Sequence, residues 1–197
     1  MKQVLKTTSY LLFFLLIFQS CKKIIDSVGS SGIDKVSVED LKKIDVNNIY
    51  SISIPDYMSE MKSLNEDASL QYANIFKETY TIVIDENKQD FINAFKNAEI
   101  YNDSISPLKN YVDYQVNSIT ENVEDGKSNK SDAPLRIKNA SQYEINGKID
   151  GIDISYLIGF VEGKENMFMM MSWTTKNRFK KYKNTFNLIH NSLKLKQ

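Results

Sequence analysis

The chain has 197 residues, with 25 Lys and Arg against 25 Asp and Glu, so its formal charges cancel at neutral pH. Nucleic-acid binding relies on a basic excess that neutralises phosphates, and this balance argues against a nucleic-acid partner. With 42% hydrophobic residues, 7 glycines and 3 prolines, the composition fits one globular domain and excludes collagen-like and low-complexity classes.

The first twenty residues have the pattern of an export signal. Lys2 and Lys6 precede an uninterrupted apolar run at 10–18, whose length suits the hydrophobic region of a signal peptide. A transmembrane helix needs roughly 20 apolar residues, and Gln19 and Ser20 end this run early. We therefore expect residues 1–20 to be a signal peptide.

The only cysteine, Cys21, follows this segment directly, and a single cysteine cannot form an internal disulfide. The sequence FQSC at 18–21 resembles the lipobox of bacterial lipoproteins: Ser20 matches the small residue before the cysteine, whereas Phe18 and Gln19 depart from the commonest choices. The resemblance implies that the Cys21 thiol carries a diacylglycerol and, with further acyl chains such as palmitate, anchors the protein in a membrane. The alternative is an incidental thiol beside an uncleaved signal.

Residues 21–36 are expected to be a flexible linker, because they contain the sequence GSSG and little that could pack. A linker of this length has an r.m.s. span of about 20 Å. Without residues 1–20 the chain keeps 23 basic and 25 acidic residues. We expect residues 37–197 to form a single domain.

The first half of this domain predicts three strands and then two helices. Alternating apolar residues predict strands at 50–54, 69–75 and 78–86. The last of these is apolar on both faces, which favours an interior strand. Apolar residues then recur at spacings of three and four, which predicts helices at 87–98 and from Ser106, with Pro107 in the first turn. The polar segment 124–133 is expected to be a mobile loop.

The last third predicts an antiparallel set closed by a helix. Strands are expected at 141–145, 152–162 and 167–174, with GKEN at 163–166 as a turn between the last two. Thr174 or Thr175 can cap a final helix. Its apolar stripe must lie on the sheet and consists of Phe179, Tyr182, Phe186, Ile189 and Leu193.

This order of elements predicts an α+β fold in which helices cover an antiparallel sheet. The opening strand YSISIP, the late meander YEINGKIDGIDISYLIGFVEGKENMFMMMSWT and the closing helix FKKYKNTFNLIHNSLK resemble the PsbP/Mog1 type of α/β/α sandwich, over roughly 50–196. The resemblance implies a non-enzymatic accessory or binding protein, and it carries over no site residues.

The sequence offers few groups for chemistry. His190, the only histidine, falls one position off the apolar stripe of the last helix and is expected at the surface. It has no evident partner for a nucleophile pair or a metal site, so we predict no catalytic residue, no metal site and no cofactor. Asp150 and Asp153 in KIDGID are expected to form a turn between strands, not a calcium site.

The segment MFMMMSW at 167–173 allows two interpretations. Alternation sends two groups of residues to opposite faces of the strand: Phe168, Met170 and Ser172 to one, and Met167, Met169, Met171 and Trp173 to the other. A strand covered on both sides explains all of them as core. The second group could instead line a site for an apolar ligand, because methionine side chains adapt to such ligands.

The function that follows is a lipid-anchored, non-catalytic protein of the bacterial cell envelope, whose domain binds a partner protein or assists an assembly. The alternative is a carrier or sensor of a small apolar ligand or lipid. An enzyme based on the Asp150 and Asp153 pair comes third. The residues after Cys21 lack an acidic run that resembles a surface-export signal, so we expect the outer membrane, facing the periplasm.

Overall fold

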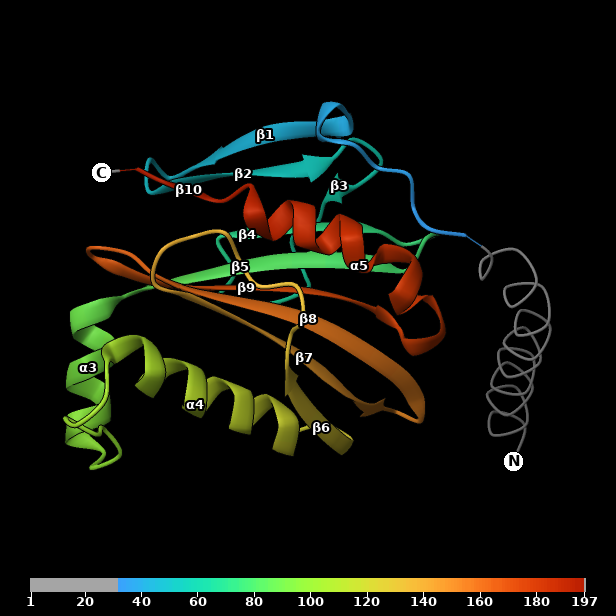
Figure 1. Ribbon diagram of the computed structural model, residues 1–197. Helices are drawn as coiled ribbons and strands as arrows, with labels where there is room; N and C mark the ends of the chain where they lie inside the picture. The colour runs from blue at the N-terminus through green and yellow to red at the C-terminus, as the bar shows by residue number, and fades with distance from the viewer. Residues whose placement is uncertain (1–31, 197) are drawn as a thin grey trace, which may run out of the picture. The chain divides into compact units, whose positions relative to one another are not determined.

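The computed structural model describes residues 32–196, so the predicted signal peptide, Cys21 and most of the predicted linker lie outside the described residues. The domain is built in layers, with a large sheet covered by helices on both faces and a small sheet stacked beyond one of them (Figure 1). The large sheet has the strand order β3-β4-β5-β9-β8-β7-β6, and every neighbouring pair is antiparallel. The predicted α+β fold, an antiparallel sheet covered by helices, is confirmed.

The centre of the large sheet is formed by β5 (Thr79–Asn87), β9 (Asn166–Thr175) and β8 (Ile152–Glu162). Both faces of these strands are covered, and their side chains divide between two apolar clusters. The edge on one side consists of β4 (Leu70–Asn74) and the two-residue β3 (Ser59–Glu60). The strands predicted at 69–75, 78–86, 152–162 and 167–174 are therefore confirmed.

A small sheet of three strands packs against the closing helix. It consists of β1 (Leu41–Val46), β2 (Tyr50–Pro55) and β10 (Lys194–Leu195), in the order β1-β2-β10. Asn47 and Asn48 form the turn between β1 and β2 with positive φ angles, 47° and 56°, which is the conformation of a tight hairpin. Only β2 was predicted; β1 and β10 were missed.

Two helices, α3 (Lys88–Asn97) and α4 (Pro107–Glu121), cover one face of the large sheet. The side chain of Asn87 caps α3 by accepting hydrogen bonds from two backbone N–H groups. At the start of α4, the hydroxyl oxygen of Ser106 accepts a hydrogen bond of 3.2 Å from the backbone N–H of Lys109. Both predicted helices are confirmed, including Pro107 in the first turn of α4.

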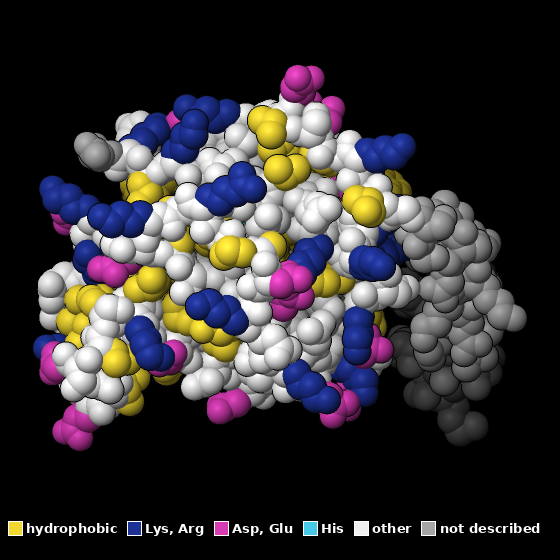
Figure 2. Space-filling model, in the orientation of Figure 1, with side chains coloured by type: hydrophobic (Ala, Val, Ile, Leu, Met, Phe, Trp, Pro, Cys, Tyr) yellow, Lys and Arg dark blue, Asp and Glu magenta, His cyan; other side chains and the backbone are white. Residues whose placement is uncertain are grey.

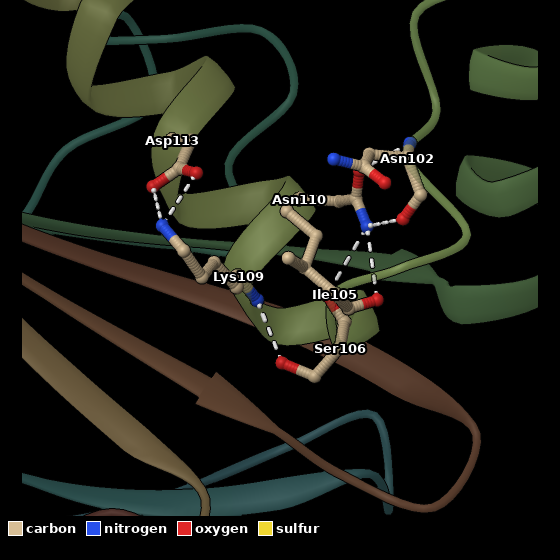
Figure 3. A network of polar contacts seen from close by, with 6 residues as sticks. All are labelled: Asn102, Ile105, Ser106, Lys109, Asn110 and Asp113. Atoms are coloured by element: carbon tan, nitrogen blue, oxygen red, sulfur yellow. Dashed lines mark hydrogen bonds and ion pairs between the residues drawn. The ribbon is translucent and has the colours of Figure 1, made fainter.

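A polar network fixes the loop that joins the two helices (Figure 3). The Asn110 side-chain amide donates to the backbone oxygen of Asn102 at 3.0 Å, and its Oδ1 atom accepts from the Asn102 backbone N–H at 2.8 Å. Next to it, Lys109 pairs with Asp113 one helical turn further on, at 2.7 Å. The side chain of the buried Asn110 therefore holds the start of α4 to Asn102 in the preceding loop.

The prediction of a mobile loop at 124–133 is wrong, because most of this segment is strand β6 (Glu124–Lys130). It pairs with β7 (Ala140–Ile149), with a register shift between Glu124 and Lys127. An edge strand has one neighbour and exposes nearly all of its side chains, so no apolar alternation marks it. The predicted strand at 141–145 is the middle of the longer β7.

The other face of the large sheet carries α5 (Lys176–Asn191). The predicted stripe is buried at every position, and Leu193 continues it just beyond the helix end. Thr175 occupies the position before the helix, but its hydroxyl bonds the side chain of Asn177 and caps no backbone group. α5 contacts β8 and β9 on one side and β2 of the small sheet on the other, so it is enclosed from two directions.

Positive and negative side chains are interspersed over the face of the domain shown in Figure 2, with small apolar areas between them. Within residues 32–196, no helix is long and apolar enough to span a membrane.

Candidate functional site

The methionine strand β9 places its two groups of side chains as the alternation predicts. Phe168 and Met170 lie in the cluster beneath α5, whereas Met167, Met169, Met171 and Trp173 face α3 and α4. Met167 and Met169 are buried, and Met171 and Trp173 are partly exposed. The four residues proposed as ligand-lining therefore share one face, and its two ends differ in solvent access.

A cavity of about 590 Å³ opens on this face, beside α4. Its floor is formed by Ile82 and Ile84 of β5 and by Met169 and Met171 of β9, and Ile119 of α4 forms one wall. The cavity exists because α4 packs over β6, β7 and β8 and leaves part of β5 and β9 uncovered. Its polar rim consists of Asn65, Asp67, Asp85, Glu86 and Gln115.

Two of the four methionine-strand residues line this cavity, and two do not. Met167 is fully buried and is not part of the cavity lining. Trp173 lies further along the strand, where its ring stacks on Tyr80 with 5.2 Å between ring centroids and 13° between ring planes. Tyr156 packs on the other side of Trp173, at 6.0 Å. The strand thus provides a flexible methionine floor that continues into a rigid aromatic stack.

Tyr111 of α4 adds an unusual group at the buried side of the same face. Its side chain is fully buried, and its hydroxyl lies near the side chains of Glu86 and Gln115. Burial, and then the negative charge of the nearby Glu86, raise the pKa of Tyr111 well above its ordinary value. The hydroxyl is therefore a neutral donor close to Glu86 and Gln115, two residues of the cavity rim.

The expectation that His190 lies at the surface is wrong: its side chain is fully buried. Because α5 is enclosed by the large sheet and by β2, positions beside its main stripe are buried as well. Nε2 of His190 lies 3.1 Å from the Ser172 hydroxyl, and Nδ1 lies 2.8 Å from Oε1 of Gln142. The amide of Gln142 donates to the backbone oxygen of Ala133, so its Oε1 accepts from Nδ1–H of the imidazole.

The row of Ser172, His190 and Gln142 has the order of a nucleophile, a base and an orienting group, as in hydrolytic triads. It cannot act as one. The Ser172 and His190 side chains are 0% exposed, and the Ser172 hydroxyl also pairs with Thr81 at 2.8 Å, within the core. Burial lowers the pKa of His190 from 6.5 to about 3, so the imidazole stays neutral and is a very weak base. The network belongs to the packing of the core, and its members are 18 and 48 residues apart in the chain, so no local pattern indicates it.

Asp34, within the predicted linker, is bound to the domain by its side chain. Its carboxylate is 9% exposed and accepts hydrogen bonds from the hydroxyls of Tyr57 at 2.9 Å and Thr185 at 2.8 Å. Lys77 lies 3.6 Å away as its ion-pair partner. The backbone N–H of Asp34 also donates to the carbonyl of Lys181 in α5. The chain therefore joins the folded domain at Asp34.

Asp150 and Asp153 occupy the β7–β8 hairpin, as the turn interpretation predicts. Asp150 and Gly151 have φ angles of 51° and 75°, both in the left-handed region that a two-residue hairpin turn requires. Among residues 32–196, no three His, Cys, Asp or Glu side chains are grouped so that they could hold a metal ion. The pair of aspartates is explained by the hairpin itself.

The fold and the site together describe an α+β protein with a buried polar network in its core and a cavity on the sheet face that carries α3 and α4. No protein-family model matches the chain, and no curated protein matches its sequence. Solved structures show partial similarity. Cyanobacterial PsbP (CyanoP) from Synechocystis sp. PCC 6803 aligns with a TM-score of 0.48 and 12% identity, over 85% of this chain and 98% of that one.

Two further structures are similar in the same way. A mutant of the protein Mog1 aligns with a TM-score of 0.47 and 6% identity, over 80% of this chain and 96% of that one. LpqN of Mycobacterium tuberculosis, described as involved in cell envelope biogenesis, aligns with a TM-score of 0.43 and 10% identity, over 75% and 83% of the two chains. PsbP and Mog1 are the proteins that give the fold type in the sequence resemblance its name.

Proposed function

We propose that the chain is a lipid-anchored protein of the bacterial cell envelope, and that its domain works without catalysis by binding another envelope protein or assisting an assembly. The lipobox-like sequence ending at Cys21 is the observation that carries the anchor. The membrane in this proposal is the outer membrane, and the domain faces the periplasm. The sealed Ser172–His190 network supports a non-catalytic role, because the only histidine of the chain can neither meet a substrate nor accept a proton near neutral pH.

The first experiment tests the anchor. The intact mass of the protein extracted from membranes is compared between wild type and Cys21→Ala, with Ser27→Ala as a matched control in the same region. We expect a wild-type mass that corresponds to cleavage before Cys21 plus acyl chains, the same modification in the control, and neither in Cys21→Ala. An unmodified wild-type chain would remove the anchor from the proposal.

A second experiment tests the partner. Photo-crosslinking amino acids are placed in living cells at Tyr114, an exposed aromatic residue of α4, and at Lys164, an exposed residue in the β8–β9 turn. A defined adduct with one envelope protein at one position, lost when Cys21 is replaced by Ala, supports the proposal. If neither position gives an adduct and no protein accompanies the chain from solubilised envelopes, the binding role is contradicted.

One observation favours a second function, the carriage or sensing of a small apolar ligand or lipid. The cavity above Met169 and Met171 has about 590 Å³, a size suited to small ligands, and combines an apolar floor with a few polar groups at its rim. Organic extracts of the purified protein, analysed by mass spectrometry, would contain a bound lipid. We expect Met171→Trp to fill the cavity and release that lipid, whereas Met61→Trp, outside the cavity, should retain it.

A further inference from the structure

Several exposed apolar residues gather at one end of the large sheet. Phe76 is 88% exposed and Ile75 is 59% exposed, and both lie in the turn between β4 and β5. Ile149 and Ile152, 43% and 55% exposed, flank the turn between β7 and β8. Large apolar side chains that project from turns are seldom explained by the packing of the domain itself.

The strand register places these two turns at the same end of the sheet. β5 begins beside the end of β9, because Tyr80 pairs with Trp173. β8 also begins there, because Ile154 pairs with Thr175. The β4–β5 turn directly precedes β5, and the β7–β8 turn directly precedes β8. Figure 1 shows both turns at the same side of the domain, next to the first turn of α5. We call this side, defined by residues 75–78 and 149–152, the turn end.

The described chain also begins at the turn end. Asp34 pairs with Lys77, which directly follows Phe76, so the first described residues are held against the β4–β5 turn. Ile33, 61% exposed, lies next to Asp34 and adds another apolar side chain there. From Cys21 to Gly32 the chain can span at most about 40 Å, at up to about 3.6 Å per residue.

We propose that the turn end is a membrane contact, in which Phe76, Ile75 and Ile152 enter the interfacial region of the bilayer that holds the acylated Cys21. This inference rests on the proposed lipid anchor, which brings the turn end within reach of the bilayer. Apolar side chains at such contacts are buried about 5–10 Å into the boundary between headgroups and acyl chains. The anchor and the turn end then fix the orientation of the domain, with α3 and its following loop directed away from the membrane.

Most of the charged side chains around the turn end are paired within the domain. Lys77 is paired with Asp34, Arg178 with Glu78 at 3.2 Å, and Lys148 with Asp125 at 2.8 Å. The remaining exposed charges near the turns include Lys35 on one side and Asp150 on the other. Lys176 in the first turn of α5 is also exposed near the β7–β8 turn, so charges of both signs surround the contact, and the contact rests on the insertion of apolar side chains.

The test uses the full-length acylated protein in phosphatidylcholine vesicles that contain lipids brominated near the top of the acyl chains. Tryptophan is introduced in three separate variants: Phe76→Trp and Ile152→Trp at the turn end, and Ile100→Trp as the control. Ile100 is 51% exposed and lies beyond α3, at the opposite end of β5. The wild-type emission, which comes from Trp173 alone, is subtracted, and circular dichroism checks that each variant is folded.

We expect a blue shift and a loss of the added emission at positions 76 and 152, and neither change at position 100. Vesicle flotation of the same samples reports on the anchor separately. If the protein floats with the vesicles but all three positions show the same emission, the membrane contact is overturned and the anchor stands. If the wild-type protein fails to float, the anchor and the contact that rests on it are both overturned.

Discussion

The buried imidazole of His190 makes the stability of the domain depend on pH in a way that can be calculated. Its pKa falls from 6.5 in the unfolded chain to about 3 in the folded domain, because burial disfavours the charged form. A group with a depressed folded pKa stabilises the fold fully above its unfolded pKa, and this stability is lost as the pH falls towards the folded pKa. The loss approaches about 1.4 kcal/mol per pH unit below 6.5.

Between pH 7 and pH 5 the free energy of unfolding should therefore fall by about 2 kcal/mol from this residue, and by about 4 kcal/mol in all by pH 3. The window above pH 5 isolates the effect, because His190 is the only histidine and carboxylates such as Asp45 and Asp132, whose pKa values their lysine partners lower, titrate below it. Urea unfolding at constant ionic strength, followed by circular dichroism, measures the free energy at each pH.

Two variants separate the titration from the packing. His190→Asn removes the titrating group, so its free energy of unfolding should be lower at pH 7 and should change little between pH 7 and pH 5. Ser172→Ala removes both hydrogen bonds of the Ser172 hydroxyl, to His190 and to Thr81, and costs about 1–3 kcal/mol, but it keeps the imidazole and so should keep the wild-type slope. If the wild type and His190→Asn show the same slope in this window, the buried neutral imidazole is the wrong description.

Three other substitutions test packing by chemical denaturation at pH 7, with wild type as reference. Gly126→Ala should lower the free energy of unfolding by about 1–3 kcal/mol, because its Cβ would overlap the backbone oxygen of Thr120; an unchanged midpoint would contradict this close approach. Asp34→Ala should lower the free energy of unfolding by about 1–3 kcal/mol, because the hydroxyls of Tyr57 and Thr185 lose their acceptor and Lys77 loses its ion-pair partner; an unchanged free energy would mean that the first described residues do not stabilise the domain. Met170→Ala should cost about 2–5 kcal/mol and Met171→Ala clearly less, since Met170 is fully buried and Met171 borders the cavity; equal losses would count against an open cavity.

The elements that sequence reasoning found are those whose pattern is local. The hairpin of β8 and β9 is marked by two long apolar runs around GKEN, and α5 is marked by a stripe that repeats every three or four residues. Edge strand β6 was missed because a strand exposed to water on nearly every side chain needs no apolar residues. β10 was missed because two residues carry no period, and their pairing with β2 exists only in the folded chain.

In the candidate site, too, the features with a local sequence pattern were predicted and those that depend on distant parts of the chain were not. The alternation along β9 was enough to place Met167, Met169, Met171 and Trp173 on one face. The cavity beside two of them was not predictable, because it depends on where α4 packs across the sheet. The burial of His190 depends on the small sheet behind α5, and its partner Gln142 is 48 residues away in the chain. Contacts at that separation leave no pattern in a single sequence.

The pairing of β10 with β2 also has a consequence for the order of folding. Ser53 and Ser192, which bond at 2.8 Å between the backbone N–H of one and the hydroxyl of the other, are separated by 139 residues. Closing a loop of that length costs conformational entropy before any contact is gained, and proteins rich in such contacts fold slowly. The small sheet can therefore be completed only after residue 195 has been synthesised, so β2, one of the first strands made, waits for its second neighbour until residues 194–195 are available.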